Sequence, residues 1–392
     1  MVAPVQLPFE QADPLQFPPR LRQLQAQGTV HRVRTAVGDE AWLVTRHREV
    51  RRLLDDERLG RRAHPEPDTA ARVGESALLS RGLVGDFATE HADHQRMRAL
   101  LQPHFAPKHM RALRPRIEAL TTRLLDELTK QTRPADLHTA LALPLPILVI
   151  CELLGVPYAD RDQFRSWTVD VGNMRDRARS EQGLADLVAY GRRLVAFKRR
   201  NPGDDVISRL CATEGVSDDE AAALSMSLLF AGHETTVVRI GLTALLLLAN
   251  PELWRALVGN PDLVPNAVEE TLRTSRKVGI ISRYARTDLE IDGVTIKAGE
   301  LVLLHIGAGN HDPAVFADPD RADVTRSASG HLTFGYGARF CIGAPLARVE
   351  LQIVFSQLVS RFPTLRLAAD VKDLALRDDQ LAGGLSELPV RW

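Results

Sequence analysis

The 392-residue sequence has little of what marks several specialised classes of protein. Lysine plus arginine equals aspartate plus glutamate at 50 each, which argues against a nucleic-acid partner or an acidic membrane surface. Only three cysteines are present, Cys151, Cys211 and Cys341, and they are too few and too scattered for a disulfide framework. We therefore expect a reducing, cytoplasmic setting.

Long hydrophobic runs are also missing. Apolar runs such as residues 244–249 fall far short of the roughly 20 residues that span a bilayer. The first ten residues are broken by Pro4 and Pro8 and lack the basic and apolar regions of a signal peptide. Aromatic residues are only 5% of the chain, but 44% of its residues are hydrophobic, enough for a large core. We expect a soluble protein with one large domain or two closely packed ones, and no membrane partner.

The pattern along the chain is mostly helical, with two short groups of strands. A proline- and glycine-rich stretch at residues 61–87 predicts a long loop with one short helix. The periodicity predicts helices at 21–27, 91–101, 110–130, 141–154, 161–200 with a break near 182–183, 217–250, 265–275 and 344–361. The alternation predicts strands at 30–37, 40–45, 289–291, 294–296 and 301–304.

One cysteine stands in an unusual place. Cys341 lies in a glycine-rich loop just before a helix predicted from Ala344, whose free N–H groups would stabilise a thiolate. For an arbitrary cysteine, an inert buried thiol is the commoner case. A zinc site is less favoured because no second cysteine or paired histidine lies at ligand spacing nearby. The surrounding pattern decides between these alternatives.

The longest predicted helix has a polar segment in the middle of an apolar sequence. Ser217 and Glu220 form a capping box that starts it, and it is apolar nearly all round until Asn250. In its middle, residues 231–236 place a glycine beside four polar residues. Because this conflicts with the propensity of a buried helix, the segment is a candidate functional site.

The pattern Phe-x-x-Gly-x-Arg-x-Cys-x-Gly at residues 334–343 closely resembles the haem-thiolate loop of the cytochromes P450. This resemblance implies a P450 fold, mainly α with a smaller β-rich lobe, as a single domain over residues 1–392. It also implies haem b (iron protoporphyrin IX) as cofactor and Cys341 as the iron ligand. The loop residues implied to contact the haem are Phe334, Gly335, Arg339 and Gly343, with Gly337 allowing the close backbone approach.

Further motifs extend the resemblance along the chain. Ala231 and Gly232 would let the long helix pass close over the cofactor, while Thr235 opens a local kink by bonding a helical carbonyl. In this family Thr235 holds oxygen during its reduction and Glu234 delivers protons, so both are implied to be catalytic. The haem propionates are implied to pair with His94, Arg98, Arg283 and Arg339. A structural salt-bridge triad is implied for Glu270, Arg273 and Arg321.

Substrate contacts follow by analogy with the family. An apolar segment at residues 278–281 suits a hydrophobic substrate. Ordinary core packing is about as good an explanation for any one of these residues. The predicted pocket residues are Phe87, Phe230, Val278, Ile280, Ile281 and Leu381.

The resemblance implies a soluble bacterial P450 monooxygenase that inserts one oxygen atom from O2 into a C–H bond of an apolar small molecule. Regional similarity to actinobacterial enzymes suggests hydroxylation of a polyketide, macrolide or terpenoid in antibiotic biosynthesis. A ferredoxin and its reductase would supply electrons, docking near Arg96, Lys108 and Arg111. The alternatives are a peroxide-driven peroxygenase and a haem-binding sensor without turnover; Glu234 and Thr235 argue against both.

Overall fold

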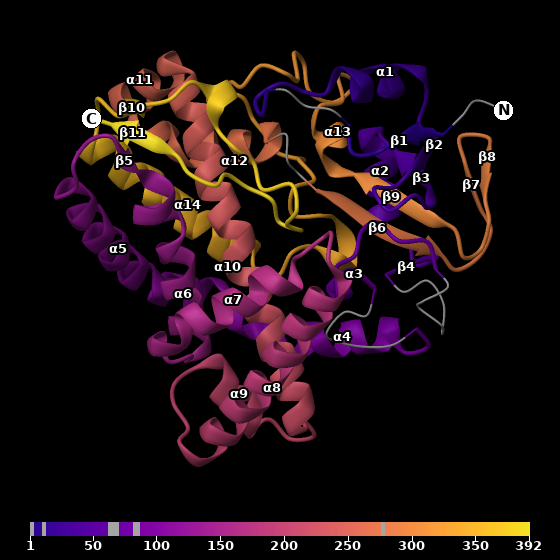
Figure 1. Ribbon diagram of the computed structural model, residues 1–392, viewed down its shortest axis with the longest axis horizontal. Helices are drawn as coiled ribbons and strands as arrows, with labels where there is room; N and C mark the ends of the chain where they lie inside the picture. The colour runs from indigo at the N-terminus through magenta and orange to yellow at the C-terminus, as the bar shows by residue number, and fades with distance from the viewer. Residues whose placement is uncertain (1–3, 10–12, 62–69, 81–86, 276–278) are drawn as a thin grey trace.

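The computed structural model describes the chain except residues 1–3, 10–12, 62–69, 81–86 and 276–278. Most of the helices fill one side of the molecule, and the main sheet lies on the other side, near the N-terminus and beside a few shorter helices (Figure 1). The predicted architecture, mainly helical with a smaller β-rich lobe, is confirmed.

Most of the helices lie between residues 77 and 274 of the chain. Their bounds are α1 Pro19–Gln27, α2 His47–Leu54, α3 Ala77–Ser80, α4 Glu90–Leu101, α5 Pro107–Thr129, α6 Pro144–Leu154, α7 Arg161–Val171, α8 Arg177–Arg200, α9 Val206–Ala212, α10 Asp218–Ala249, α11 Pro251–Gly259, α12 Val264–Thr274, α13 Ile306–Asn310 and α14 Ala344–Arg361. A π-helical turn, His138–Ala142, precedes α6.

The strands form three sheets among the described residues. Their bounds are β1 Val5–Gln6, β2 Val30–Arg34, β3 Glu40–Val44, β4 Leu59–Gly60, β5 Ala135–Asp136, β6 Ile280–Ala285, β7 Leu289–Ile291, β8 Val294–Ile296, β9 Leu301–His305, β10 Arg366–Leu367 and β11 Pro389–Arg391. The main sheet has the order β1-β2-β3-β9-β6-β4, with β9 parallel to β3 and antiparallel to β6. Strand β6 lies between β9 and the edge strand β4, and it carries Arg283.

Helix α10 crosses the helical lobe. It has 32 residues and is about 48 Å long at 1.5 Å per residue. The Ser217 side chain accepts a hydrogen bond from the Glu220 N–H at 3.1 Å, which confirms the predicted cap. By length and composition α10 could cross a membrane, but 67% of its apolar window is buried inside the protein, as in a core helix.

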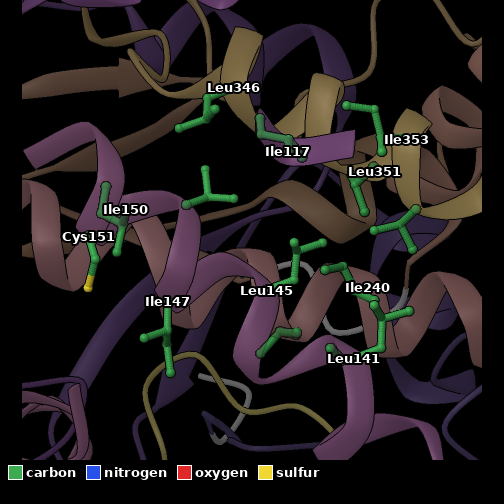
Figure 2. Packing of buried hydrophobic residues seen from close by; sticks show 14 of the residues in the cluster. Ile117, Leu141, Leu145, Ile147, Ile150, Cys151, Ile240, Leu346, Leu351 and Ile353 are labelled. Carbon is green, nitrogen blue, oxygen red and sulfur yellow. The ribbon is translucent and has the colours of Figure 1, made fainter. Parts of the chain in front are cut away.

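The main core is formed where α5, α6, α10 and α14 pack together (Figure 2). Ile117, Ile150, Ile240 and Leu351, one from each of these helices, are at most 1% exposed. Cys151 lies in the same core, and burial raises the pKa of its thiol to about 12. It is therefore an inert core residue, as its sequence context predicts.

The predicted break near residues 182–183 is wrong. The break lies at Gly172–Asp176, between α7 and α8, and α8 runs unbroken through Gly183. A Cβ at Gly183 would lie 2.7 Å from the Asp170 Cβ and 2.9 Å from the Val171 backbone nitrogen. The glycine thus allows α7 to pack closely against α8, and it does not end a helix.

Helix α2 was not predicted. Its buried residues Val50, Leu53 and Leu54 follow the spacing of an amphipathic helix, so the signal was present in the sequence. The predicted strands at 289–291 and 294–296 and the predicted helix at 344–361 are confirmed.

Candidate active site

The cysteine loop is a tight turn that starts at Leu332. The Gly335 N–H donates to the Leu332 carbonyl and the Cys341 N–H donates to the Phe334 carbonyl, each at 2.8 Å. Gly335 has φ 77°, in the left-handed region that favours glycine. These bonds hold Cys341 at the end of the loop, just before α14 begins.

Gly337 has a second reason to be glycine. Its φ is 70°, and a Cβ at this position would lie 1.7 Å from Oδ1 of Asp55. The same carboxylate oxygen accepts a hydrogen bond from the Ala338 N–H at 2.9 Å. Gly343 is different: its φ is −82°, and a Cβ there would meet only the Cys341 sulfur, at 3.9 Å. The protein itself therefore requires glycine at 337 but not at 343.

Cys341 is exposed, unlike Cys151 and Cys211, although protein atoms surround much of its thiol. Burial raises the pKa of its thiol, while the N–H groups of Gly343 and Ala344 and the cations Arg98 and Arg348 act to lower it. Among the described residues, no three His, Cys, Asp or Glu side chains gather closely enough to hold a metal ion. A metal at Cys341 therefore needs a cofactor that supplies its other ligands, which fits an iron porphyrin.

A cavity of about 410 Å³ is lined by α4, α10, β6 and the cysteine loop. Three of the predicted substrate-pocket residues line it, Phe230, Ile280 and Ile281. Its other apolar lining residues are Leu78, Leu79, Met97, Leu101, Leu228, Ala231 and Ile342.

The remaining predicted pocket residues do not line this cavity. Phe87 instead lies under Arg286, whose guanidinium carbon is 4.6 Å from the ring centroid and which donates to the Phe87 carbonyl at 3.0 Å. The Leu381 N–H donates to the Gly172 carbonyl, between α7 and α8. The prediction is wrong for these two residues with respect to the 410 Å³ cavity. Val278 lies outside the described residues.

Cations gather on one wall of the cavity. His94, Arg283 and Arg339 all line it, as predicted from their motifs, together with Arg61. Burial, with repulsion from Arg61 and Arg339, lowers the pKa of Arg283 to about 9. Burial, with repulsion from Arg339, Arg61 and Arg98, lowers the pKa of His94 to about 4. Two carboxylates placed here would relieve this repulsion, so the wall fits the propionates of a haem.

Arg98 and Glu90 brace this wall. Arg98 donates to the Phe340 carbonyl at 2.8 Å, so it holds the cysteine loop directly. Glu90 is buried and accepts hydrogen bonds from Arg339 and Arg286, both at 2.8 Å. Glu90 was not predicted from the sequence, because an acid at the start of a polar helix has the ordinary pattern of an exposed helix end.

Phe334 lies beside the cysteine and is partly buried. The Arg348 guanidinium carbon is 4.5 Å from its ring centroid, and the Phe340 ring centroid is 6.3 Å away. Arg348 in turn donates two hydrogen bonds of 2.8 Å to Glu269. Phe334 is thus held in place by α12 and α14, next to the thiol.

Opposite the cations, α10 presents Ala231, which lines the cavity, and Thr235, which lies one turn further along the helix and does not line it; both are exposed. The Thr235 hydroxyl donates to the Ala231 carbonyl at 2.8 Å, which is the helical carbonyl contact that the sequence predicts. Gly232 faces elsewhere: a Cβ there would lie 2.7 Å from Cδ1 of Ile150 in α6. Its small size therefore serves the packing of α10 against α6, and the cofactor contact expected for Gly232 stays a prediction.

Glu234 is buried and turned away from Ala231 and Thr235. One carboxylate oxygen lies 3.5 Å from a terminal nitrogen of Arg377, and the other lies 3.7 Å from Nε2 of His233. Arg377 belongs to a hairpin near the C-terminus, residues 375–386. It was missed because no local sequence signal links a C-terminal arginine to the middle of α10.

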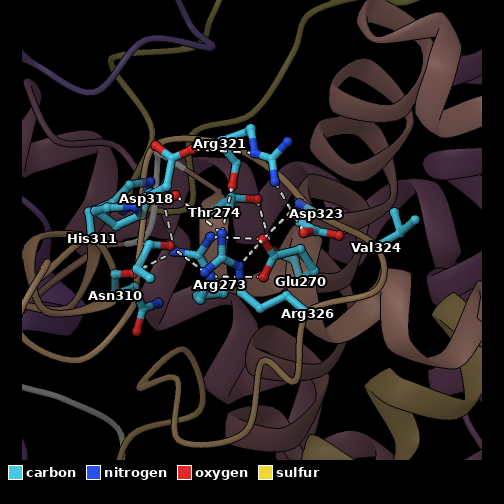
Figure 3. Close-up of polar contacts among 12 residues, drawn as sticks. Glu270, Arg273, Thr274, Asn310, His311, Asp318, Arg321, Asp323, Val324 and Arg326 are labelled. Carbon is cyan, nitrogen blue, oxygen red and sulfur yellow. Dashed lines mark hydrogen bonds and ion pairs between the residues drawn. The ribbon is translucent and has the colours of Figure 1, made fainter.

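Behind the cysteine loop, α12 carries a buried ion pair (Figure 3). Glu270 and Arg273 are both 0% exposed and share two hydrogen bonds of 2.8 Å. Arg273 also donates to the carbonyls of Asn310 and Pro319. The Asn310 side chain accepts from the Leu332 N–H at 2.7 Å, so this pair is connected to the cysteine loop through Asn310.

The third member of the predicted triad is wrong. Arg326, not Arg321, contacts Glu270, with a hydrogen bond of 3.2 Å from its Nε (Figure 3). The Arg321 side chain is 68% exposed and pairs with Asp318 and Asp323. The chain turns after Arg321, so that the Asp323 N–H and the Arg326 side chain reach the same oxygen of Glu270.

A second and larger groove, of about 660 Å³, lies beside the main sheet. Some of its polar groups pair with one another: Arg32 pairs with Glu40, and the Trp42 indole N–H donates to Glu300 at 2.8 Å. It contains none of the predicted haem-contact residues, whereas His94, Ala231, Arg283 and Arg339 line the 410 Å³ cavity, so the latter is the candidate active site.

Comparison with known proteins agrees with this site. A family model described as "Cytochrome P450" matches residues 192–373. The chain is 41% identical to pentalenolactone synthase from Streptomyces exfoliatus, over 98% of both chains. It is 39% identical to mycinamicin IV hydroxylase/epoxidase from Micromonospora griseorubida, again over 98% of both.

A solved structure shows the same fold. The substrate-free cytochrome P450 PimD, a polyene macrolide antibiotic pimaricin epoxidase, superposes with a TM-score of 0.89 at 39% identity, covering 100% of both chains. Whole-chain identity at this level, with the cysteine loop and the α10 segment in place, leaves one assignment. The chain belongs to the cytochrome P450 family, and it is a haem-dependent monooxygenase.

Proposed function

We propose that this monooxygenase hydroxylates an apolar intermediate of secondary metabolism, a polyketide, macrolide or terpenoid. One observation carries the proposal: the Cys341 loop, the cationic wall and the exposed face of α10 border one cavity whose remaining lining is mostly apolar. The names of the relatives support it, since they act in pentalenolactone formation, on mycinamicin IV and on pimaricin.

The cofactor proposed is haem b. Cys341 would bind its iron, and His94, Arg283 and Arg339 would pair with its propionates, since these three cations share one wall of the cavity. When bound and reduced, the haem supplies the chemistry that activates O2. Phe334, held under Arg348, would exclude water from the thiol.

The residues of α10 would handle protons. Each turnover consumes two electrons and two protons, and converts O2 and the substrate into hydroxylated product and water. The Thr235 hydroxyl is exposed and can orient a water molecule, whereas buried Glu234 can take up and release a proton. Both are therefore proposed as catalytic residues, with Glu234 acting through water.

Electrons are proposed to come from a ferredoxin and its reductase in the cytoplasm. Lys108 and Arg111 are exposed at the start of α5 and could steer an acidic partner. Arg96 contributes less, because it donates to Glu220 at 2.9 Å and to the Gly215 carbonyl at 2.7 Å. Residues 1–392 would act as a single domain, because α4, β6, α10 and the cysteine loop all contribute to one site.

The first test is the carbon monoxide difference spectrum of the reduced, haem-loaded protein. The wild type should give the red-shifted band of thiolate-bound iron, and Cys341→Ser should lose it. A wild type without this band contradicts thiolate ligation. Spin-state titrations with macrolactones and with sesquiterpenoid lactones would then identify the substrate class, and the absence of a shift with both would contradict the proposed substrates.

The two other activities can be tested with the same preparation. Turnover with hydrogen peroxide, and none with NADPH, ferredoxin and reductase, would indicate a peroxygenase. Substrate binding without any turnover would indicate a sensor.

A further inference from the structure

The surroundings of Glu234 raise the question of how protons reach it. Glu234 is 5% exposed, so it cannot exchange protons with bulk solvent by itself. Two ionisable side chains lie against its carboxylate, His233 from its own helix and Arg377 from the 375–386 hairpin. His138 and Arg165 act electrostatically in the same region.

His233 does not connect Glu234 to solvent. It is 0% exposed, and burial lowers its pKa, so the imidazole is neutral. Its Nδ1 lies 2.9 Å from the Leu229 carbonyl, which can only accept, so Nδ1 carries the single proton. Nε2 then has no proton to give, and it faces the Thr168 hydroxyl at 3.4 Å and Glu234. His138, also buried, has its pKa lowered by burial too.

Arg377 connects Glu234 to solvent. Its side chain is 24% exposed, so it extends from the Glu234 carboxylate to solvent. One terminal nitrogen is shared between Glu234 and the Gly383 carbonyl at 3.2 Å. Its Nε is buried without a hydrogen-bond partner in the protein. Such a group is ordinarily completed by a bound water molecule, and this Nε belongs to the same guanidinium that contacts the Glu234 carboxylate.

The hairpin that carries Arg377 is fitted closely to α10. Gly384 has φ 99°, and a Cβ there would lie 2.8 Å from Cγ2 of Val238, one turn beyond Glu234. The backbone N–H of Arg377 donates to the Gly384 carbonyl at 2.9 Å, so Gly384, which packs against α10, also sets the position of the arginine. Because of this contact, the arginine keeps a defined position relative to Glu234.

We propose that Arg377 positions the Glu234 carboxylate and that protons reach Glu234 through water along the Arg377 side chain, between the C-terminal hairpin and α10. This inference rests on the proposed role of Glu234 in the monooxygenase. Arg377 touches neither cofactor nor substrate in this scheme, so it is a positioning residue. The proton passes from solvent water to the water at Nε and then to Glu234, with no change in oxidation state.

The experiment measures substrate-free turnover of the haem-loaded protein with spinach ferredoxin and ferredoxin–NADP⁺ reductase as electron donors. In this reaction NADPH, O2 and one proton give NADP⁺ and hydrogen peroxide. Arg377→Met should lower the rate of NADPH consumption about tenfold, less than the loss of a full general acid, and should increase the solvent deuterium isotope effect. Arg377→Lys should recover most of the rate.

A double-mutant cycle separates this role from a structural one. Glu234→Gln should lower the rate and raise the isotope effect, and adding Arg377→Met to it should change neither further. The matched control is Arg366→Met, at an exposed arginine in β10, which should behave as the wild type. The proposal is overturned if Arg377→Met keeps the wild-type rate and isotope effect, or if its effect multiplies that of Glu234→Gln.

Two further outcomes are distinguishable. If Arg377→Met does not retain haem, Arg377→Gln replaces it in the same cycle, because its amide can still donate to the Gly383 carbonyl. If the wild type consumes no NADPH, the ferredoxin part of the proposed function is wrong. The variants are then compared with hydrogen peroxide as oxidant and guaiacol as reporter, where the same non-additivity is expected.

Discussion

The two sides of the candidate site differ in how completely their buried arginines are paired. On the cysteine side, every side-chain nitrogen of buried Arg273 donates to Glu270 or to a backbone carbonyl. On the α10 side, Arg377 and Arg239 each have a buried nitrogen without a partner in the protein. Saturated networks rigidify a structure, while unsatisfied groups are retained where water or a ligand completes them.

This difference separates the work of the two sides. The cysteine side has to hold one sulfur in one place, so it is built from pairs that resist movement. The α10 side has to exchange protons and water with solvent, so complete pairing there would prevent its chemistry. We therefore expect substitutions on the cysteine side to reduce stability and haem retention, and substitutions on the α10 side to reduce turnover while the protein stays folded.

The largest effect is expected for Arg273→Met. It leaves the Glu270 charge buried and half-paired, which costs about 3–5 kcal/mol of folding free energy. Chemical denaturation and haem retention would measure it. Arg326→Met should cost less, because Arg326 makes one longer bond to Glu270. Arg321→Met is the matched control and should leave both measurements unchanged; a large loss there would contradict the assignment of Arg326.

A smaller loss is expected for Gly337→Ala. The substitution places a Cβ at a φ of 70° and against the Asp55 carboxylate, and should cost about 1–3 kcal/mol. Gly343→Ala should cost less, since its φ is −82°. Thermal unfolding of the two variants side by side would measure the difference. Equal losses would show that the crowding at Gly337 is not what limits the loop.

On the other side of the site, Thr235→Ala should leave stability within about 0.5 kcal/mol, because its hydroxyl bonds a carbonyl of its own helix. Turnover should change instead: more of the electrons from NADPH should be used to form hydrogen peroxide, and fewer should be used to form product. Product formed per NADPH, with a compound found by spin-state titration, would measure this. An unchanged amount of product per NADPH, together with a loss of stability, would contradict the proposed difference between the two sides.

The last effect concerns pH. Burial alone would raise the pKa of Glu269, but hydrogen bonds from His331 and Arg348 lower it to about 2. Because the folded pKa is depressed, the stabilisation is present above the unfolded value of 4.5 and is lost as pH falls from about 4.5 to about 2. Urea denaturation over this range should show the loss, and Glu269→Gln should remove that part of the pH dependence.

Much of the site could be predicted from local sequence. The glycines and the cysteine at residues 335–343 lie within one turn, and the Ser217 cap lies within one helix end, so the neighbours that determine their conformation are close in the chain. Thr235 and the Ala231 carbonyl are one helical turn apart, so their contact also follows from spacing. Such features depend on backbone geometry that each segment carries with it.

Pairing between distant segments could not be predicted in the same way. Arg321 and Arg326 are both basic residues in one loop after Pro319, and only the path of that loop decides which of them reaches Glu270. Gly183 has the sequence pattern of a helix break, yet the crossing of α7 and α8 makes it a packing residue. In each case the deciding atoms belong to another element.

The sequence by itself determined the chemistry of this protein: a thiol at the start of a helix, an acid and an alcohol in the middle of another, and apolar periodicity sufficient to bury both helices. Only the tertiary structure decided which charges complete that chemistry, bringing Glu90 to Arg339, Arg326 to Glu270 and Arg377 to Glu234. The physical reason is the distance along the chain over which each kind of interaction acts. Backbone geometry and periodicity act within a few turns of chain, whereas an ion pair depends on the final positions of two side chains up to 249 residues apart.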